Sequence, residues 1–179
     1  MGTRDEPQAL NGVAHFLEHL VFKGTKTRSA LELAKTLEAV GGEVNAYTTR
    51  EYTCFHTTSL REHLGLSLDV LTDIINNAVL DPVEFQKERE VVLHEIDMTA
   101  DQLDEYIFDL CFEEAYKGHP LGRSILGTEK TLLGMTPTMV KSYYNNYYRG
   151  ENLIVAVAGD VDHDEVVRIC KSCLGRKKL

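Results

Sequence analysis

The sequence predicts an α/β fold of the α+β kind, in which helices pack on a mainly antiparallel sheet. Several segments repeat apolar residues with helical spacing. Two neighbouring stretches, residues 43–49 and 52–59, are rich in β-branched and aromatic residues and are separated by a short link, as in a hairpin. A third apolar run, residues 153–158, has the composition of a buried strand.

The length and composition are those of an ordinary globular domain. At 179 residues, with 43% hydrophobic and 26% charged residues, the chain is long enough for one domain with its own core. No apolar run approaches the roughly 20 residues that a membrane span needs, so we expect none. The formal net charge of −9 argues against nucleic acid as a partner, because binding to phosphates requires basic residues.

The first part of the chain is expected to form two helices and the hairpin. One helix covers about residues 12–22. The next begins at Ser29, which forms a capping-box pattern with Glu32, and Gly41-Gly42 ends it. The two strand segments then follow directly.

The rest of the chain alternates helices and loops. Asp81-Pro82 has the pattern of a helix start, and Asp162 is expected to cap a final helix after the apolar strand. We predict the intervening helices at residues 61–79, 82–99, 103–116 and 137–148.

The most informative motif is His15-Phe16-Leu17-Glu18-His19. His15 and His19 are four residues apart, so on a helix they lie on one face and can reach a single metal ion. Glu18 then lies close enough to act as a general base toward a metal-bound water. This order of residues is the inverzincin signature of zinc peptidases. The surrounding run is strongly apolar, and burial of three ionisable groups there is costly unless a partner compensates them.

Local spacing alone does not identify a third metal ligand. The segment after Asp81 offers several acidic candidates, namely Glu84, Glu88, Glu90, Glu95 and Asp97. Glu88 and Glu95 are seven residues apart and therefore lie two turns along one helix face. Both residues can therefore face the helix that carries the histidines, one as a metal ligand and the other as a residue that supports it.

Three blocks of sequence together resemble a known family. They are the motif at 15–19, Gly41-Gly42-Glu43-Val44-Asn45-Ala46-Tyr47, and Glu88-Arg89-Glu90-Val91-Val92-Leu93-His94-Glu95-Ile96. In this order they resemble the pitrilysin/insulinase family of zinc metallopeptidases, and most closely its processing-peptidase branch. The likeness extends over about residues 2–160. It implies a zinc-dependent endopeptidase of a mitochondrion, a mitochondrion-like organelle or the bacterial cytoplasm.

The resemblance also implies roles for individual residues. His15, His19 and Glu95 would bind one Zn²⁺ per chain. Glu18 would be the general base, with Glu88 as a second catalytic carboxylate that supports the site. An extended peptide substrate would lie against the strand formed by Asn45, Ala46 and Tyr47.

The family pattern also bears on domains and partners. Residues 1–179 would form a single N-terminal-type peptidase domain, without the first strands and without the second half of full-length members. We therefore expect a second homologous half or subunit as partner and extended peptides as substrates, including basic, presequence-like ones. The alternative is a non-catalytic or partner-dependent subunit for assembly or peptide binding. Cys170 and Cys173 are assigned to core packing rather than to metal binding.

Overall fold

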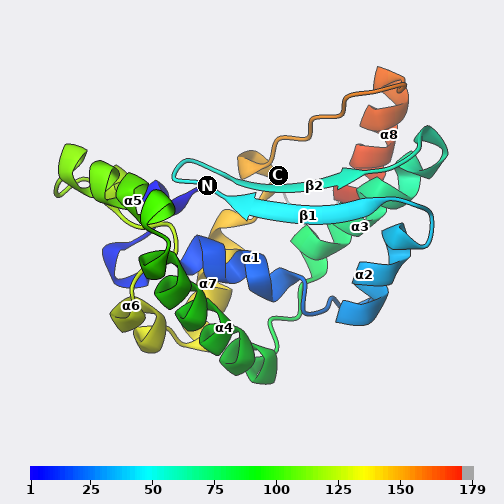
Figure 1. Ribbon diagram of the computed structural model, residues 1–179. Coiled ribbons are helices and arrows are strands. Elements are labelled where there is room, and N and C mark those ends of the chain that lie inside the picture. The colour runs from blue at the N-terminus through cyan, green and yellow to red at the C-terminus, as the bar shows by residue number, and fades with distance from the viewer. Residues whose placement is uncertain (175–179) are drawn as a thin grey trace. The chain divides into compact units, whose positions relative to one another are not determined.

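The computed structural model describes residues 1–174 (Figure 1). These residues form mostly helices and one two-stranded sheet, in which β1 pairs with β2 in an antiparallel hairpin. The helices and strands are, in order, α1 (Val13–Val21), α2 (Ala30–Glu38), β1 (Glu43–Thr48), β2 (Thr53–Thr58), α3 (Leu64–Asn77), α4 (Pro82–Asp101), α5 (Leu103–Ala115), α6 (Glu129–Gly134), α7 (Pro137–Tyr147) and α8 (His163–Leu174). The predicted fold class is confirmed.

The chain divides into two compact units. The first unit contains Met1–Leu20, Tyr47–Cys54 and Leu80–Tyr143, and the second contains Val21–Ala46, Phe55–Val79 and the residues from Tyr144 onward. Both units therefore receive part of the hairpin.

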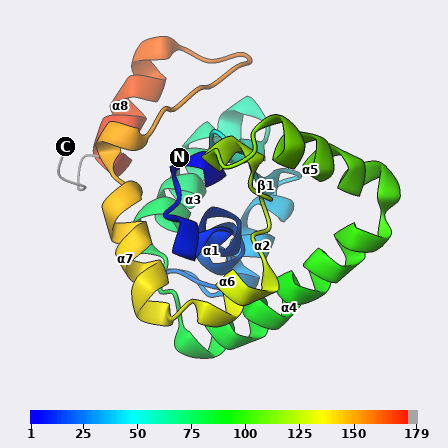
Figure 2. The ribbon, with the colours of Figure 1, turned by 90° about the vertical axis from the view of Figure 1, so that its left-hand side faces the viewer.

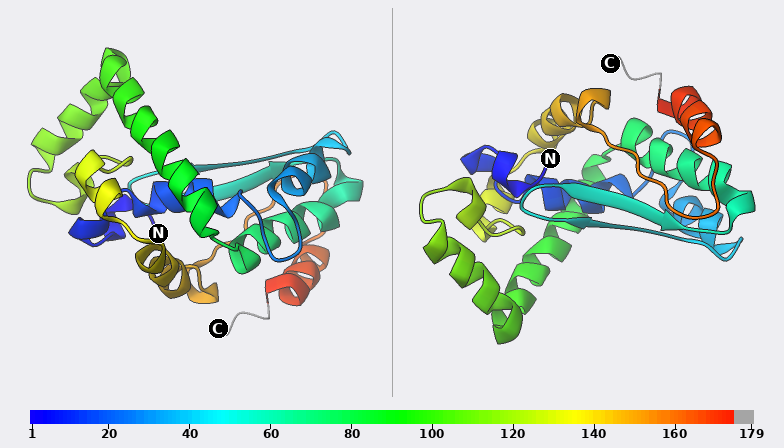
Figure 3. Two further views of the ribbon diagram at one scale, coloured as in Figure 1. Left: turned by 90° about the horizontal axis from the view of Figure 1, so that it is seen from below. Right: turned by 90° about the horizontal axis from the view of Figure 1, so that it is seen from above.

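The first unit has α1 at its centre. Val13, Phe16 and Leu17 of α1 are fully buried, and the ring of Phe16 meets that of Phe85 from α4 edge to face, with centroids 5.0 Å apart. Such aromatic contacts add about 1 kcal/mol to the burial of apolar area. Helix α4 ends near Gln102, and Figure 3 shows α4 and α5 diverging from this point as the two arms of a V.

The helix caps predicted at Ser29, Asp81 and Asp162 are confirmed. The Ser29 hydroxyl accepts a hydrogen bond from the Glu32 amide (3.3 Å), and the Glu32 carboxylate accepts one from the Ser29 amide (2.7 Å). The Asp81 carboxylate caps α4 by accepting from the amide of Val83 at 2.7 Å. Asp162 caps α8 through the amide of Glu165 at 2.9 Å. These local patterns are sufficient to place helix ends because they satisfy the free N–H groups of the first turn.

The prediction of a buried strand at residues 153–158 is wrong. This segment lies outside any ladder, and Ile154 is 94% exposed. Within residues 1–174, the backbone groups of residues 154–158 make no hydrogen bond to other backbone groups. An apolar, β-branched composition favours a strand only where a neighbouring strand supplies hydrogen bonds and a packing surface, and β1 and β2 pair with each other instead.

Two smaller differences concern helices. The predicted helix at 61–79 is split into a 3-10 turn, Arg61–His63, and α3, which ends at Asn77. Helix α6 was not predicted, because its six residues are too few to show a helical period. Its start does carry a local signal, since the hydroxyl of Thr128 accepts from the amide of Thr131 at 3.2 Å.

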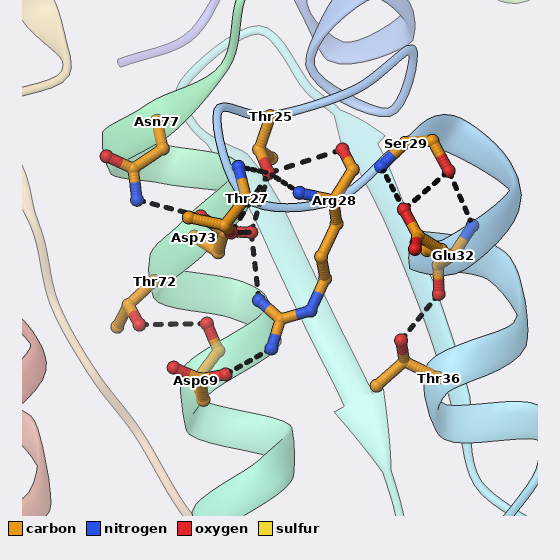
Figure 4. A network of polar contacts seen from close by, with 10 residues as sticks. All are labelled: Thr25, Thr27, Arg28, Ser29, Glu32, Thr36, Asp69, Thr72, Asp73 and Asn77. Carbon is orange, nitrogen blue, oxygen red and sulfur yellow. Dashed lines mark hydrogen bonds and ion pairs between the residues drawn. The ribbon is translucent and has the colours of Figure 1, made fainter.

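The second unit contains a buried polar network centred on Asp73 (Figure 4). One carboxylate oxygen accepts hydrogen bonds from the hydroxyls of Thr25 and Thr27, both at 2.7 Å, and from Arg28 at 2.9 Å. The other accepts from the side-chain amide of Asn77 at 2.7 Å. Burial raises the pKa of Asp73, but these hydrogen bonds together hold it below its ordinary value. The network therefore ties the loop before α2 to helix α3.

We expect Asp73→Ala to destabilise the chain by about 3 kcal/mol, because it leaves the Arg28 guanidinium and two hydroxyls without their buried acceptor. Asp69→Ala is the matched control, because Asp69 also pairs with Arg28 but its side chain is 51% exposed. The control should cost less than about 1 kcal/mol. Chemical denaturation measures both losses, and equal losses would contradict the central role of Asp73.

Because the pKa of Asp73 is depressed in the folded state, the contribution of its ionised carboxylate to stability is present above the unfolded pKa of about 4 and is lost as the pH falls below it.

Candidate metal centre

The histidine motif lies on the most open side of a buried helix. Within α1, the neighbours of the motif are fully buried, His15 is nearly so, and Glu18 and His19 are half-buried. The apolar spacing of α1 thus fixes which way the polar residues face. The rings of His15 and His19 lie with centroids 4.7 Å apart, as their spacing of four residues predicts.

Helix α4 brings Glu95 to both histidines. One carboxylate oxygen of Glu95, Oε2, lies 3.8 Å from Nε2 of His15 and 3.6 Å from Nε2 of His19. The three residues each offer a ligand atom, and these atoms all lie within 4.8 Å of one another. Three donors around one point can bind a single metal ion.

The donor set fits zinc on both distance and chemistry. Tetrahedral zinc with bonds of about 2.0–2.1 Å places neighbouring ligand atoms roughly 3.3 Å apart. The distances of 3.8 and 3.6 Å from Oε2 of Glu95 to the two histidine nitrogens are close to this value. Oε2 of Glu95 is also buried without a hydrogen-bond partner. A buried carboxylate oxygen without a partner is costly, and a bound cation removes this cost.

Glu88 lies two turns before Glu95 on the same helix and contacts the other nitrogen of His19. Its Oε2 is 3.3 Å from Nδ1 of His19, and the residue is only 5% exposed. A carboxylate at the second ring nitrogen of a metal-binding histidine fixes the ring orientation and tautomer. The two glutamates that spacing alone could not separate thus have different positions, one beside Nε2 and one beside Nδ1.

Glu18 is held by a residue that sequence analysis missed. The Thr48 hydroxyl donates to Oε2 of Glu18 at 2.5 Å. Burial raises the pKa of Glu18, the Thr48 hydrogen bond and His19 oppose the rise, and Glu95 adds to it. No spacing rule links position 48 to position 18, although Thr48 does lie in the predicted strand.

The histidines differ in their surroundings. Burial, and secondarily the charge of His19, lowers the pKa of His15 to about 4. His15 is therefore neutral at pH 7 and keeps a free lone pair for a metal. His94, which neighbours Glu95 in sequence, is exposed and lies outside the cluster.

The predicted substrate strand corresponds to β1. Along this strand exposed and half-buried residues alternate, with Asn45 and Tyr47 exposed and Ala46 half-buried. Within residues 1–174, β1 pairs only with β2, so its second edge carries no strand. Tyr47 belongs to the same unit as the histidine cluster, whereas Asn45 and Ala46 belong to the second unit.

The chain is similar in sequence to proteins that are named as zinc proteases or as a subunit of a processing peptidase. An uncharacterised zinc protease of Streptomyces coelicolor is 42% identical over 168 residues, which are 94% of this chain and 37% of that protein. The β subunit of the mitochondrial-processing peptidase of Saccharomyces cerevisiae is 40% identical over 174 residues, or 97% of this chain and 38% of that protein.

The family follows from sequence profiles. The profile described as Insulinase (Peptidase family M16) matches residues 1–129, and that of the Peptidase M16 inactive domain matches residues 134–178. The chain belongs to the insulinase family of peptidases, as the three sequence blocks predicted.

Solved structures agree with this assignment. The structure of a protease from Helicobacter pylori superposes with a TM-score of 0.92 at 30% identity, covering 99% of this chain and 43% of that one. Pitrilysin superposes with a TM-score of 0.84 at 26% identity, covering 99% of this chain and 19% of pitrilysin. The chain thus spans less than half the length of these relatives. Among the described residues, no helix has the length and apolar character needed to cross a membrane.

We expect Thr48→Val to raise the pKa of Glu18 further, because the Thr48 hydroxyl donates to the ionised carboxylate and so favours it. Carbon-13 NMR of the side-chain carboxyl, recorded without metal, measures this shift. Thr58→Val, an exposed threonine at the end of β2, is the control and should leave the titration unchanged. A Glu18 titration that is the same in Thr48→Val and in the unaltered chain would contradict the assigned hydrogen bond.

Proposed function

We propose that the chain carries the zinc centre of an endopeptidase that hydrolyses extended peptides. The observation that carries this proposal is the convergence of His15, His19 and Glu95, with Glu18 beside them on the same helix. In this assignment His15 and His19 bind Zn²⁺ through Nε2 and Glu95 binds it through Oε2. The centre thus has three protein ligands and an open fourth position, which is the pattern of catalytic rather than structural zinc.

Bound zinc would lower the pKa of a coordinated water from about 16 to about 7 and would polarise the scissile carbonyl. Glu18 is the general base in this proposal. The hydrogen bond from Thr48 to its Oε2 orients the carboxylate, which takes the proton from the attacking water and passes it to the departing amine. A carboxyl whose pKa is raised by burial is a stronger base than an exposed one, which suits this task near neutral pH.

Glu88 has a supporting role in this proposal. By accepting from Nδ1 of His19, its carboxylate would keep Nε2 free to bind the metal and would increase the basicity of the ring. It acts through His19 and does not itself touch the reacting atoms.

We further propose that the substrate peptide adds to the second edge of β1 as a short strand. Backbone hydrogen bonds along residues 45–47 would provide affinity with little demand on sequence, and neighbouring side chains would select residues of the peptide. The surplus of acidic residues along α4 and α5 favours basic peptides, such as presequence-like ones, among the possible substrates.

A second homologous half or subunit is part of the proposal. The relatives are more than twice as long as this chain, and one of them is named as a subunit. The competing function is therefore a non-catalytic or partner-dependent subunit that assembles with another chain or binds peptides. The complete set of His15, Glu18, His19 and Glu95 favours the enzyme, because a purely structural subunit does not require a general base.

We expect about one zinc per chain in protein purified without chelator, measured by elemental analysis. Glu95→Gln should lose most of this zinc, because it replaces a charged ligand by a neutral one. Glu88→Gln should weaken zinc binding by about 10–100-fold, as outer-shell changes do. His94→Gln, next to the ligand but exposed, is the control and should retain the metal. A well-folded chain without zinc would contradict the proposed centre.

We expect Glu18→Gln to reduce peptide hydrolysis by a factor of about 10²–10⁴, the contribution of a general base, while zinc content stays unchanged. A quenched-fluorescent extended peptide measures the rate. Activity that survives the change would remove Glu18 from the mechanism. If the unaltered chain binds zinc but cleaves no peptide, the partner-dependent subunit becomes the preferred function.

A further inference from the structure

Helix α1 begins at a position that cannot carry a capping side chain. Gly12 precedes the first residue of α1 and has a φ of +92°, which L-residues rarely adopt. A Cβ atom at Gly12 would also lie 2.5 Å from the carbonyl oxygen of Leu126. Serine, threonine, asparagine or aspartate normally satisfies the free N–H groups at a helix start. At this helix start none of them fits.

Glu6 takes over the capping from outside the helix. Its Oε2 accepts hydrogen bonds from the amide of Gly12 (2.8 Å) and from the side-chain amide of Asn11 (3.0 Å). Its Oε1 accepts from the amide of Ala14 at 2.8 Å. Both oxygens are engaged, and Glu6 is only 4% exposed. The carboxylate also lies at the positive end of the helix dipole, where a negative charge is favourable.

Glu6 is itself anchored to the segment that leads into α6. The guanidinium of Arg123 donates to the backbone oxygen of Glu6 at 2.8 Å, and the Asn11 side chain donates to the carbonyl of Ser124 at 3.1 Å. The Thr131 hydroxyl donates to the carbonyl of Asn11 at 2.8 Å. Figure 2 shows α6 beside α1, which is seen nearly end-on. The start of α1 is thereby fixed to the segment around residues 123–131, whereas Glu95 lies on α4.

We propose that Glu6 is a positioning residue for the metal centre: its carboxylate fixes the first turn of α1 and so sets the approach of His15 and His19 to Glu95. His15 follows Ala14 directly, and α1 has only nine residues, so a shift at its start moves both histidines. Metal and catalytic sites tolerate displacements of only about 0.5 Å. The inference deepens the proposed function and depends on it for its catalytic meaning.

The charge of Glu6 supports positioning over simple stabilisation. Burial raises the pKa of Glu6 to about 7, although the hydrogen bonds from Ala14, Asn11 and Gly12 and the charge of Arg123 oppose the rise. A raised carboxyl pKa means that the contribution of Glu6 to stability is fully present below its unfolded value near 4.3 and is lost as the pH rises through 7. The ionised form is nevertheless the one in which both oxygens can accept from the helix. With a pKa of about 7, about half of the Glu6 carboxyl groups are ionised at neutral pH, and this ionised form holds the helix start at a cost to stability.

The test compares Glu6→Gln with Glu51→Gln, which alters an exposed carboxylate of the same unit that pairs with Arg4. Glutamine keeps the shape of Glu6 but points an NH₂ group at one of the backbone donors.

In the metal-free Glu6→Gln variant, hydrogen exchange of the first-turn amides of α1 should accelerate about tenfold or more, while amides of the second unit stay protected. Zinc affinity should fall by about 10–100-fold, as for other residues that orient ligands. The absorption of bound Co²⁺, which reports ligand geometry, should change in Glu6→Gln and stay constant in Glu51→Gln.

A pH series tests whether the charge of Glu6 changes the stability of the chain. The melting temperature of the metal-free chain should fall relative to that of Glu6→Gln as the pH rises from 5 to 8. Unchanged zinc affinity and an unchanged Co²⁺ spectrum in Glu6→Gln would overturn the inference, as would exchange that accelerates equally throughout the chain. If the unaltered chain binds no zinc, the proposed function fails, and the first-turn exchange rates then decide the role of Glu6 by themselves.

Discussion

The structure depends on one constraint, which is that a helix buried on nearly all sides carries three ionisable groups. Burial of α1 through Val13, Phe16 and Leu17 contributes to the core, but it also removes water from His15. Each polar group on this helix therefore needs a partner within the protein or a bound ion. The positions of α4 and of the turns before α1 follow from this requirement.

The buried carboxyl groups of the chain show how hydrogen-bond donors and neighbouring charges set the pKa of a buried group. Asp73 is buried, yet four donors that include a guanidinium hold its pKa low. Glu6 is buried with three neutral donors, and its pKa rises to about 7. Glu18 has one hydroxyl donor and a neighbouring carboxylate, and its pKa is raised. The two carboxylates with raised pKa values, Glu6 and Glu18, thus both contact or lie on α1, whereas the carboxylate of Asp73 in the second unit is held ionised by its donors. Clusters of perturbed groups are typical of functional sites.

In the proposed assignment, the two helices have different roles. Helix α1 would supply two imidazole nitrogens and a base, and α4 would supply a ligand carboxylate and the carboxylate that orients His19. The exposed apolar segment at residues 154–158 and the second edge of β1 are surfaces of a different kind, since within residues 1–174 no other strand pairs with their backbone groups. Such edges are normally paired or covered in folded proteins.

The sequence by itself determined most of the features that depend on short spacing. It placed His15, Glu18 and His19 on one helix face, Glu88 and Glu95 on another, and the caps at Ser29, Asp81 and Asp162, because helical period and capping are local properties. Only the tertiary structure decided which glutamate oxygen meets the histidines, that Thr48 holds Glu18, and that Glu6 caps α1. These contacts join residues that no period relates, and they arise from the packing of separate segments. The same reason explains the failed strand at residues 153–158, since a strand exists only where another strand lies beside it.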